Sequence, residues 1–252
     1  LDYLTPIPRY ARLNKLLKKQ KGDDFSLRIR GVDELIVKHD SVMFEACNTS
    51  FQMHLQIPSY DFVQSYNWSQ AIAGPVLAIC CNSPMLMGRE LWHETRIALF
   101  QQSLDTRETS YTLKNQTPRV GFGDHWEKGT VADIIKGDIA KHRVLLTKPI
   151  NESSTGLLQK GKIPKLPALS LHNGTIYRWN RACYGVGGGK PHLRIENRYI
   201  PAGPSELDEM ANFAFWVGLM KGRPKSFDDM PSKMHFKAAK ANFVKAARTG
   251  NQ

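Results

Sequence analysis

The chain has 252 residues, of which 41% are hydrophobic and 23% are charged. This balance is typical of globular proteins and excludes a mainly disordered chain. The formal net charge of +12 favours anionic partners, among which nucleic acid, acidic lipid and nucleotide phosphates all qualify.

The N-terminal part of the chain predicts one basic helix and then a group of strands. Residues 8–20 have the composition and spacing of a short helix. Hydrophobicity then alternates with period two, which predicts four strands at residues 26–30, 34–38, 41–47 and 50–57. Because the links between them are short, we expect antiparallel neighbours.

Two helices follow these strands. An apolar stretch over about residues 60–81 predicts a long helix, and Asn82-Ser83-Pro84 ends it because proline disfavours helix at the preceding residue. A second helix is predicted at about 90–102. Residues 105–125 are polar and predict a loop, 131–139 predicts a short helix, and 149–165 a flexible excursion.

The period of two returns in the last third of the chain. It predicts strands at residues 169–172, 175–179 and 192–200. Ser205 with Asp208 resembles a capping box that begins a helix reaching about Met220. From Met210 onward that helix is apolar nearly all round, which predicts that it is buried. A last helix is predicted over 232–248, with one apolar face formed by Met234, Ala238, Ala241, Val244 and Ala247.

The cysteine spacing argues against a zinc site, and the longest apolar run argues against a membrane-spanning segment. Cys47, Cys80, Cys81 and Cys183 form no C-x-x-C pair, so no zinc site is expected. The run over 71–87 is too short and too interrupted to span a bilayer. With so few cysteines and no signal peptide in the sequence, we expect reduced thiols and a cytoplasmic location.

Two of the predicted strands carry candidate site residues on one face. Alternation places His54 on the face opposite to Met53 and Leu55, and this face is either exposed to solvent or part of a site. Glu196 and Arg198 share a face of the later strand with Arg194. They form either a surface ion-pair ladder or a carboxylate ligand for a hard cation, with arginine beside it for phosphate.

Other basic residues leave two interpretations open. Arg96 lies inside a largely apolar helix, where it is either buried against an anionic partner or points outward. Arg181 follows the predicted strand at 175–179. The run Gly185 to Lys190 lacks the Ser or Thr of a phosphate loop, since Pro191 follows the lysine, and it predicts a flexible loop.

Three motifs, in order and at similar spacing, resemble the glutamate–cysteine ligase type 2 family. Thr49-Ser50-Phe51-Gln52-Met53-His54-Leu55 is similar to the family's T-G-L-Q-V-H-V strand. Asn82-Ser83-Pro84, then Gly88 and Arg96, resembles its N-S-P…G…R segment. Glu196-Asn197-Arg198, followed by Pro204-Ser205, resembles its E-V-R strand and the P-S that begins the next helix. The resemblance covers roughly residues 40–105 and 170–222.

The resemblance implies an α+β fold of the glutamine synthetase-like type, with an antiparallel sheet and helices packed on one face. Its concave face would bind ATP, Mg²⁺ or Mn²⁺ and an amino acid. His54 and Glu196 would be metal ligands, Arg198 a catalytic residue at the phosphoryl group or the substrate carboxylate, and Arg96 and Arg181 substrate-binding residues.

The implied activity is that of an ATP-dependent ligase, which joins a glutamate-like carboxylate to an amine through an acyl phosphate. The alternatives are a non-catalytic relative that acts as a binding or regulatory module, and a nucleic-acid-binding domain, which the charge alone supports. Neither a membrane nor a nucleic acid is the expected partner. The acceptor amine and the oligomeric state stay open.

The chain departs from the family pattern at several positions. Ser50 and Gln56 replace glycines, and Pro201 stands where the family often has aspartate, which leaves the amino-acid substrate open. The family's first strands, with further acidic metal ligands, have no clear counterpart. We therefore expect residues 1–252 to be a single catalytic-type domain truncated at its N-terminus, with 222–252 as a C-terminal helical extension. Little activity is expected from this chain alone.

Overall fold

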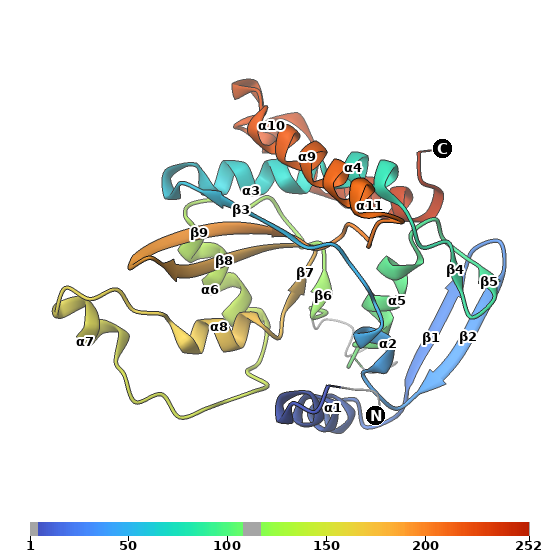
Figure 1. The fold of residues 1–252 in the computed structure, drawn as a ribbon, viewed down its shortest axis with the longest axis horizontal. Helices are drawn as coiled ribbons and strands as arrows, with labels where there is room; N and C mark the ends of the chain where they lie inside the picture. Colours follow the sequence, from blue (N-terminus) through green and yellow to red (C-terminus); the bar gives the residue numbers. More distant parts are fainter. Residues whose placement is uncertain (1–4, 108–116, 252) are drawn as a thin grey trace.

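Helices and short sheets make up the computed structural model, which describes residues 5–107 and 117–251 (Figure 1). This confirms the predicted mixed α and β class. The strand pairs are antiparallel except for the parallel pair of Val120–Gly121 with Tyr177–Arg178. The helices are α1 (Pro8–Lys21), α2 (Met43–Ala46), α3 (Phe62–Ala71), α4 (Ala73–Cys80), α5 (Thr95–Ser103), α6 (Val131–Lys141), α7 (Ser154–Gln159), α8 (Pro167–Asn173), α9 (Glu206–Lys221), α10 (Met230–Lys233) and α11 (Phe236–Thr249). The strands are β1 (Phe25–Arg30), β2 (Glu34–His39), β3 (Met53–Ile57), β4 (Met85–Leu86), β5 (Arg89–Glu90), β6 (Val120–Gly121), β7 (Tyr177–Arg178), β8 (Asn180–Gly187) and β9 (Lys190–Asn197).

The sheet that positions the candidate site has the strand order β3-β9-β8, and both pairs are antiparallel. Its β8–β9 hairpin corrects the prediction of a flexible loop at 185–190. Only Gly188 and Gly189 form the turn, with φ of 55° and 75°. A two-residue hairpin turn of this hand needs positive φ at both positions, which glycine adopts at little cost.

The hairpin of β1 and β2 packs on α5 as a separate small sheet (Figure 1). Both strands lie where alternation predicts them. Leu27 and Ile29 on β1 are buried with Leu99 of α5 in a small cluster of their own. Gly31 in the turn lies directly against the backbone of Leu91, so this hairpin and the β4–β5 hairpin are in close contact.

Two predicted strands are helices in the structure. Residues 41–47 contain the single turn α2, and residues 169–172 lie inside α8, which begins with Pro167 at its first position. Short apolar runs of this length fit either a strand or a buried helical turn, and periodicity alone does not separate the two. Tertiary contacts decide between strand and helical turn, and at α2 one such contact is the packing of the Phe44 ring against that of His39.

Other elements follow the prediction with changed bounds. The long helix over 60–81 is divided at Ile72 into α3 and α4. The second helix begins only at Thr95, because residues 89–90 form β5. Helix α6 and the segment Pro8–Lys21 lie where they were predicted. Of the polar segment 105–125, residues 108–116 lie outside the described residues.

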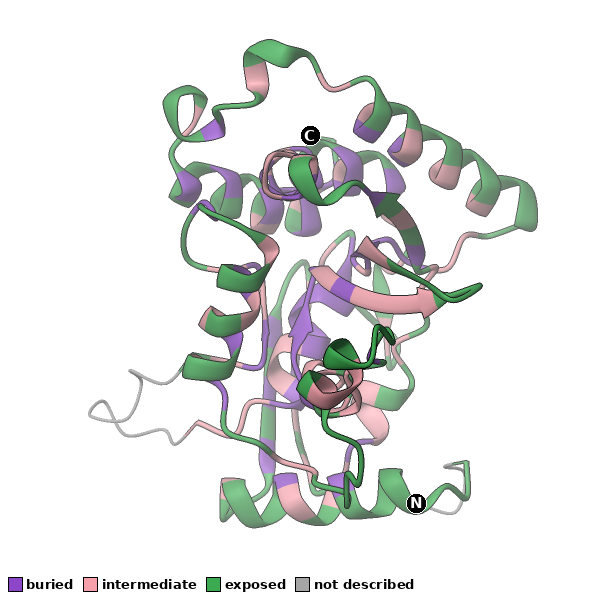
Figure 2. Cartoon of the chain, turned by 90° about the vertical axis from the view of Figure 1, so that its left-hand side faces the viewer, coloured by how far each residue is buried: buried purple, intermediate pink, exposed green. Residues whose placement is uncertain are grey.

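The prediction that the helix after Ser205 is buried is wrong. From Met210 onward only Trp216 and Met220 of α9 are buried, whereas Met210 is 57% exposed and Phe215 is 37% exposed. Figure 2 shows buried residues gathered at the centre of the molecule.

The predicted apolar face of the last helix is also wrong, apart from Ala247. The buried residues of α11 are Phe236, Ala239, Phe243, Ala246 and Ala247. The cause is that Phe236 and Phe243 share one face of the helix with Ala239 and Ala246, and this face packs on the aromatic core. The ring of Phe243 contacts those of Phe122, Trp179 and Tyr199. Within the described ranges, no helix combines the length and hydrophobicity needed to cross a membrane.

Candidate active site

The sheet register brings His54, Glu196 and Arg181 side by side from three strands. His54 on β3 lies directly opposite Glu196 on β9, and Arg181 on β8 lies opposite Glu196 from the other side. His54 Nε2 is 3.6 Å from Glu196 Oε1. The predicted meeting of the two distant segments that carry His54 and Glu196 is therefore present. Their roles as metal ligands remain a prediction.

The strand of Arg181 is held in place from the opposite face of the sheet. The side chain of Asn180 donates to Ser69 O at 3.0 Å and to Gln70 Oε1 at 2.8 Å, both on α3. Because side chains alternate along a strand, this anchor turns Arg181 to the other face, where Glu196 lies. The alternation of side chains thus decides which face of the sheet Arg181 lies on, and the contacts of Asn180 with α3 fix the position of the strand.

Glu196 is the buried centre of this group, since its side chain is only 2% exposed. Its Oε2 accepts from Arg181 Nε at 2.6 Å, and its Oε1 lies 3.7 Å from Arg198 Nε. Burial raises the pKa of the carboxyl, but Arg181 and Arg198 outweigh burial and lower the pKa below its ordinary value. Glu196 is therefore an ionised carboxylate at neutral pH.

His54 stays uncharged at neutral pH. Burial lowers the pKa of its imidazole, and Arg194, Arg181 and Arg198 lower it further against the opposing effect of Glu196. A neutral imidazole has a lone pair available for a metal ion, whereas an imidazolium has none. Its side chain is 37% exposed, so a ligand can reach it.

Arg198 carries unused hydrogen-bond donors. Its side chain is 11% exposed, and its guanidinium lies 5.6 Å from the centre of the Tyr177 ring. Within the described part of the chain, its Nε and Nη1 are buried and meet no hydrogen-bond acceptor. Buried donors of this kind are rare in folded proteins, and an oxygen-rich ligand such as a phosphoryl group would satisfy them.

Arg96 is buried, as one of the two predicted interpretations requires, and its anionic partner is internal. Its Nε lies 3.1 Å from the fully buried Glu94. Its other nitrogens donate to the backbone carbonyls of Arg198, at 3.4 Å, and of Tyr199. These contacts favour a role in positioning the strand end that carries Arg198. Substrate binding by Arg96 stays a prediction.

Sequence reasoning missed two residues of this group. Cys183 on β8 lies 3.5 Å from Glu196 Oε2, and it was missed because no predicted strand covers residues 180–184. Glu45 on α2 is close enough to Arg198 for that arginine to oppose the rise that burial causes in the pKa of Glu45. An acidic residue next to the apolar Val42-Met43-Phe44 was the available signal.

A cavity of about 190 Å³ lies over this face, between the sheet and α8. Arg181 Nη1 donates to Asn173 O of α8 at 3.2 Å, and Asn173 Nδ2 donates back to Ala182 O at 3.0 Å. The cavity is lined by His54, Leu169, Ser170, Asn173, Gly174, Arg181, Cys183, Tyr184, Arg194 and Glu196. Helix α8 therefore forms one wall of the candidate site.

The residues present fit a metal ion only in part. In the described residues, the group that could hold one consists of His54, Cys183 and Glu196, whose ligand atoms all lie within 4.8 Å of one another. Hard cations such as Mg²⁺ take six or more oxygen ligands, and this group offers one carboxylate. Arg181, Arg194 and Arg198 surround it and oppose a bare cation. The arrangement suits an anionic ligand that brings its own oxygens to the cation.

Comparison with known proteins gives one match. The model of a family described as glutamate-cysteine ligase family 2 matches residues 2–252, which confirms the resemblance seen in three motifs and extends it over the chain. No curated protein and no solved structure matches.

Proposed function

The chain belongs to glutamate-cysteine ligase family 2, and we propose that it serves an ATP-dependent ligase that activates a glutamate-like carboxylate as an acyl phosphate. An amine would then attack the activated carbon and release phosphate. The observation that carries the proposal is the group of His54, Glu196 and Arg198 on one sheet face, beside unused guanidinium donors.

The chemistry needs positioned charge more than covalent help. A carboxylate is a poor electrophile until a phosphoryl group is attached to it, and phosphoryl transfer is accelerated by positioning and charge stabilisation. Bound Mg²⁺ or Mn²⁺ would supply charge neutralisation at the ATP phosphates. In this chain Glu196 and the neutral His54 would each offer one ligand atom. Arg198 would hold an oxygen of the transferred phosphoryl group or of the substrate carboxylate.

The surplus of arginine suggests an order of binding. Even with Glu45 near Arg198, the carboxylates are outnumbered by the guanidiniums of Arg181, Arg194 and Arg198, so a divalent cation alone meets net repulsion. A nucleotide polyphosphate reverses that balance. We therefore infer that the cation enters as a complex with the nucleotide, and that Arg181 turns from Glu196 to a substrate carboxylate in the loaded site.

Three wider parts of the proposal rest on the family. The sheet would belong to a glutamine synthetase-like fold. Residues 1–252 would form one catalytic-type domain, with 222–252 as a helical extension. Because the described part offers a single carboxylate beside His54, we expect slow turnover by this chain alone.

Amino-acid-dependent ADP release by the full-length protein, with MgATP and glutamate, tests this function. Added hydroxylamine should trap the acyl phosphate as a hydroxamate. We expect His54→Ala and Glu196→Gln each to lower kcat/KM about 100-fold, whereas Arg89→Ala, which removes an exposed charge in the β4–β5 hairpin, should leave it unchanged. Unchanged turnover in His54→Ala would refute the metal-ligand role.

A non-catalytic relative that binds nucleotide is the second candidate. The observation in its favour is the same scarcity of carboxylates, since a complete site for two cations needs several. Titration calorimetry with MgATP separates the two functions. Tight binding by the full-length protein without ADP release, whichever amino acid is added, would support the binding module and reject the ligase.

A further inference from the structure

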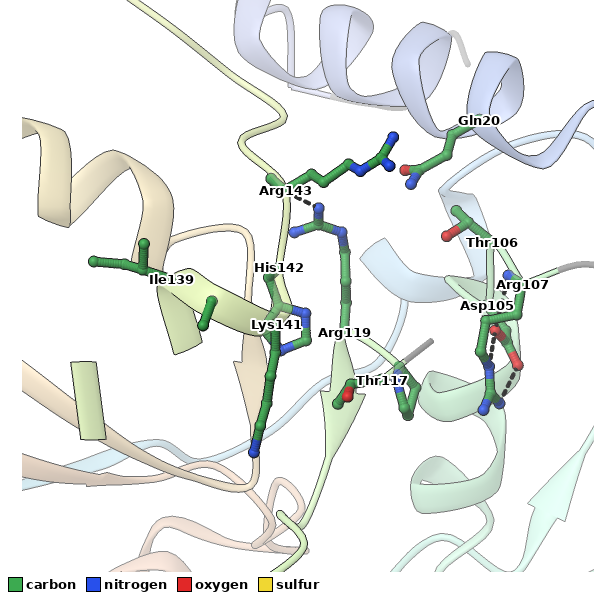
Figure 3. A pocket seen from close by; sticks show the side chains of 12 residues that line it. Gln20, Asp105, Thr106, Arg107, Thr117, Arg119, Ile139, Lys141, His142 and Arg143 are labelled. Atoms are coloured by element: carbon green, nitrogen blue, oxygen red, sulfur yellow. Dashed lines mark hydrogen bonds and ion pairs between the residues drawn. The ribbon is translucent and has the colours of Figure 1, made fainter. Parts of the chain in front are cut away.

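A second cavity, of about 460 Å³, lies between the C-terminal end of α6, the segment that enters β6 and helix α1 (Figure 3). It shares no lining residue with the cavity over Glu196. Its volume is in the range of sites for small metabolites.

The lining of this cavity is strongly basic. The cationic side chains Arg107, Arg119, Lys141 and Arg143 face one carboxylate, that of Asp105. Arg107 pairs with Asp105 at 2.6 Å. Lys141 pairs with Asp124, which is not a lining residue of this cavity, at 2.8 Å. Among the described residues these pairings leave Arg119 and Arg143 without an acidic partner.

Arg119 is the unusual member, because it is a buried charge that has no counter-ion among residues 5–107 and 117–251. It is 8% exposed. Its guanidinium donates to Thr175 O at 3.2 Å, to Thr175 Oγ1 at 3.4 Å and to Arg143 O at 2.6 Å, all of them neutral acceptors. Burial lowers the pKa of Arg119. A buried cation without an anion is costly to the fold, so such a group points to a ligand.

The neighbouring groups add donors without adding a carboxylate. His142 is buried beside Arg119, and burial lowers the pKa of its imidazole to about 4, with Asp138 opposing and Arg119 and Arg178 lowering it further. The ring is therefore neutral at pH 7 and can donate one hydrogen bond. Arg143 is exposed and extends toward Gln20 of α1 in Figure 3.

We propose that this cavity binds a phosphate-bearing small molecule, with its phosphate group between the guanidiniums of Arg119 and Arg143. A phosphate dianion supplies the counter-charge that Arg119 lacks and accepts from planar guanidinium groups in the geometry that arginine favours. His142 supplies a further neutral donor. The inference does not rest on the proposed ligase activity, because none of these residues belongs to that site.

A ligand bound in this cavity would affect Arg198 through the backbone pairing of Arg119 with Tyr177. Arg119 O accepts from Tyr177 N at 2.8 Å, and the ring of Tyr177 supports the guanidinium of Arg198. A ligand that fixes Arg119 would therefore stiffen the segment on which Arg198 rests.

Titration calorimetry with pyrophosphate and with inorganic phosphate tests the proposal on the full-length protein. Arg143→Ala changes an exposed side chain, and it is expected to weaken binding about tenfold, as is Arg119→Gln. Arg89→Ala removes the same charge elsewhere and should bind like the native protein. Equal affinity in Arg143→Ala and the native protein would overturn the proposal.

A further variant separates this cavity from the site over Glu196, which also suits phosphate. Arg198→Ala should keep pyrophosphate binding if the ligand occupies the cavity at Arg119. Loss of binding in Arg198→Ala, with full binding in Arg143→Ala, would assign the phosphate to the sheet and reject the second site. Thermal unfolding gives an independent readout, because pyrophosphate should raise the Tm of the native protein and of Arg89→Ala but not of Arg143→Ala.

Discussion

Replacing Arg198 with methionine is expected to stabilise the folded protein and at the same time remove nucleotide binding. The guanidinium is buried, its Nε and Nη1 meet no acceptor in the described structure, and Arg181 repels it. Its favourable contacts are the Tyr177 ring at 5.6 Å, a distant ion pair with Glu196 at 3.7 Å and the attraction of Glu45 on α2. Methionine has a similar length and carries no donors.

The magnitude follows from these contacts. Each buried unsatisfied donor costs about 1–3 kcal/mol, and the stack on Tyr177 returns about 1 kcal/mol. The attraction to Glu196 and Glu45 and the repulsion from Arg181 largely offset each other, because Glu196 is already paired with Arg181 at 2.6 Å. The net expectation is about 2 kcal/mol of added stability, or roughly 4–8 °C in Tm for a protein of this size.

Urea unfolding of the native protein and of Arg198→Met measures the first effect, and titration with MgATP measures the second. The matched control is Arg248→Met, which removes an exposed arginine stacked on Trp92 at 5.2 Å and should change stability by less than about 0.5 kcal/mol. If Arg198→Met lowers the free energy of unfolding by 1 kcal/mol or more, Arg198 is a structural residue and the reasoning fails.

Three further predictions concern other parts of the molecule. Because burial depresses the pKa of His142 from 6.5 to about 4, the unfolded chain binds a proton there first as the pH falls. Stability should therefore drop by about 2–3 kcal/mol between pH 6.5 and 4, and less in His142→Gln; parallel pH profiles of unfolding for the two proteins would contradict this. A Cβ at Gly31 would lie 2.2 Å from Leu91 O, so Gly31→Ala should cost about 2 kcal/mol or more, whereas Gly137→Ala, in open space on α6, should add about 0.5–1 kcal/mol. Equal urea midpoints for these two variants would show that the close approach at Gly31 is absent. Burial raises the pKa of the Cys183 thiol to about 11, so iodoacetamide at pH 8 should modify the exposed Cys47 long before Cys183. Mass spectrometry of the alkylated peptides checks that order, and early labelling of Cys183 would mean that α8 leaves the sheet readily.

Much of the candidate site followed from local patterns. Alternation along residues 50–57 and 192–200 assigned His54, Glu196 and Arg198 to the polar faces of their strands. The structure has these faces at His54 and Glu196, whereas β9 ends at Asn197 and Arg198 follows the strand. The face of a strand residue depends only on its parity, which is a local property. Motif order then indicated a family that the match over residues 2–252 confirms.

The elements that failed share a physical cause. The strand Asn180–Gly187 contains glycines, and its propensity alone favours a loop. It forms because α3 anchors Asn180 and β9 offers a partner over its whole length. Cys183 was missed together with this strand. The turns at 43–46 and 167–173 were mistaken for strands because four to seven residues do not fix a period.

The sequence by itself determined the faces of His54 and Glu196 on their strands, the mixed α and β class and the family. Only the tertiary structure decided the register that sets Glu196 between His54 and Arg181, the internal pairing of Arg96 with Glu94, and the burial of Arg119. The reason is that parity and propensity depend on neighbours along the chain, whereas register and the pairing of charges depend on residues that are distant in sequence and meet only when the core has packed.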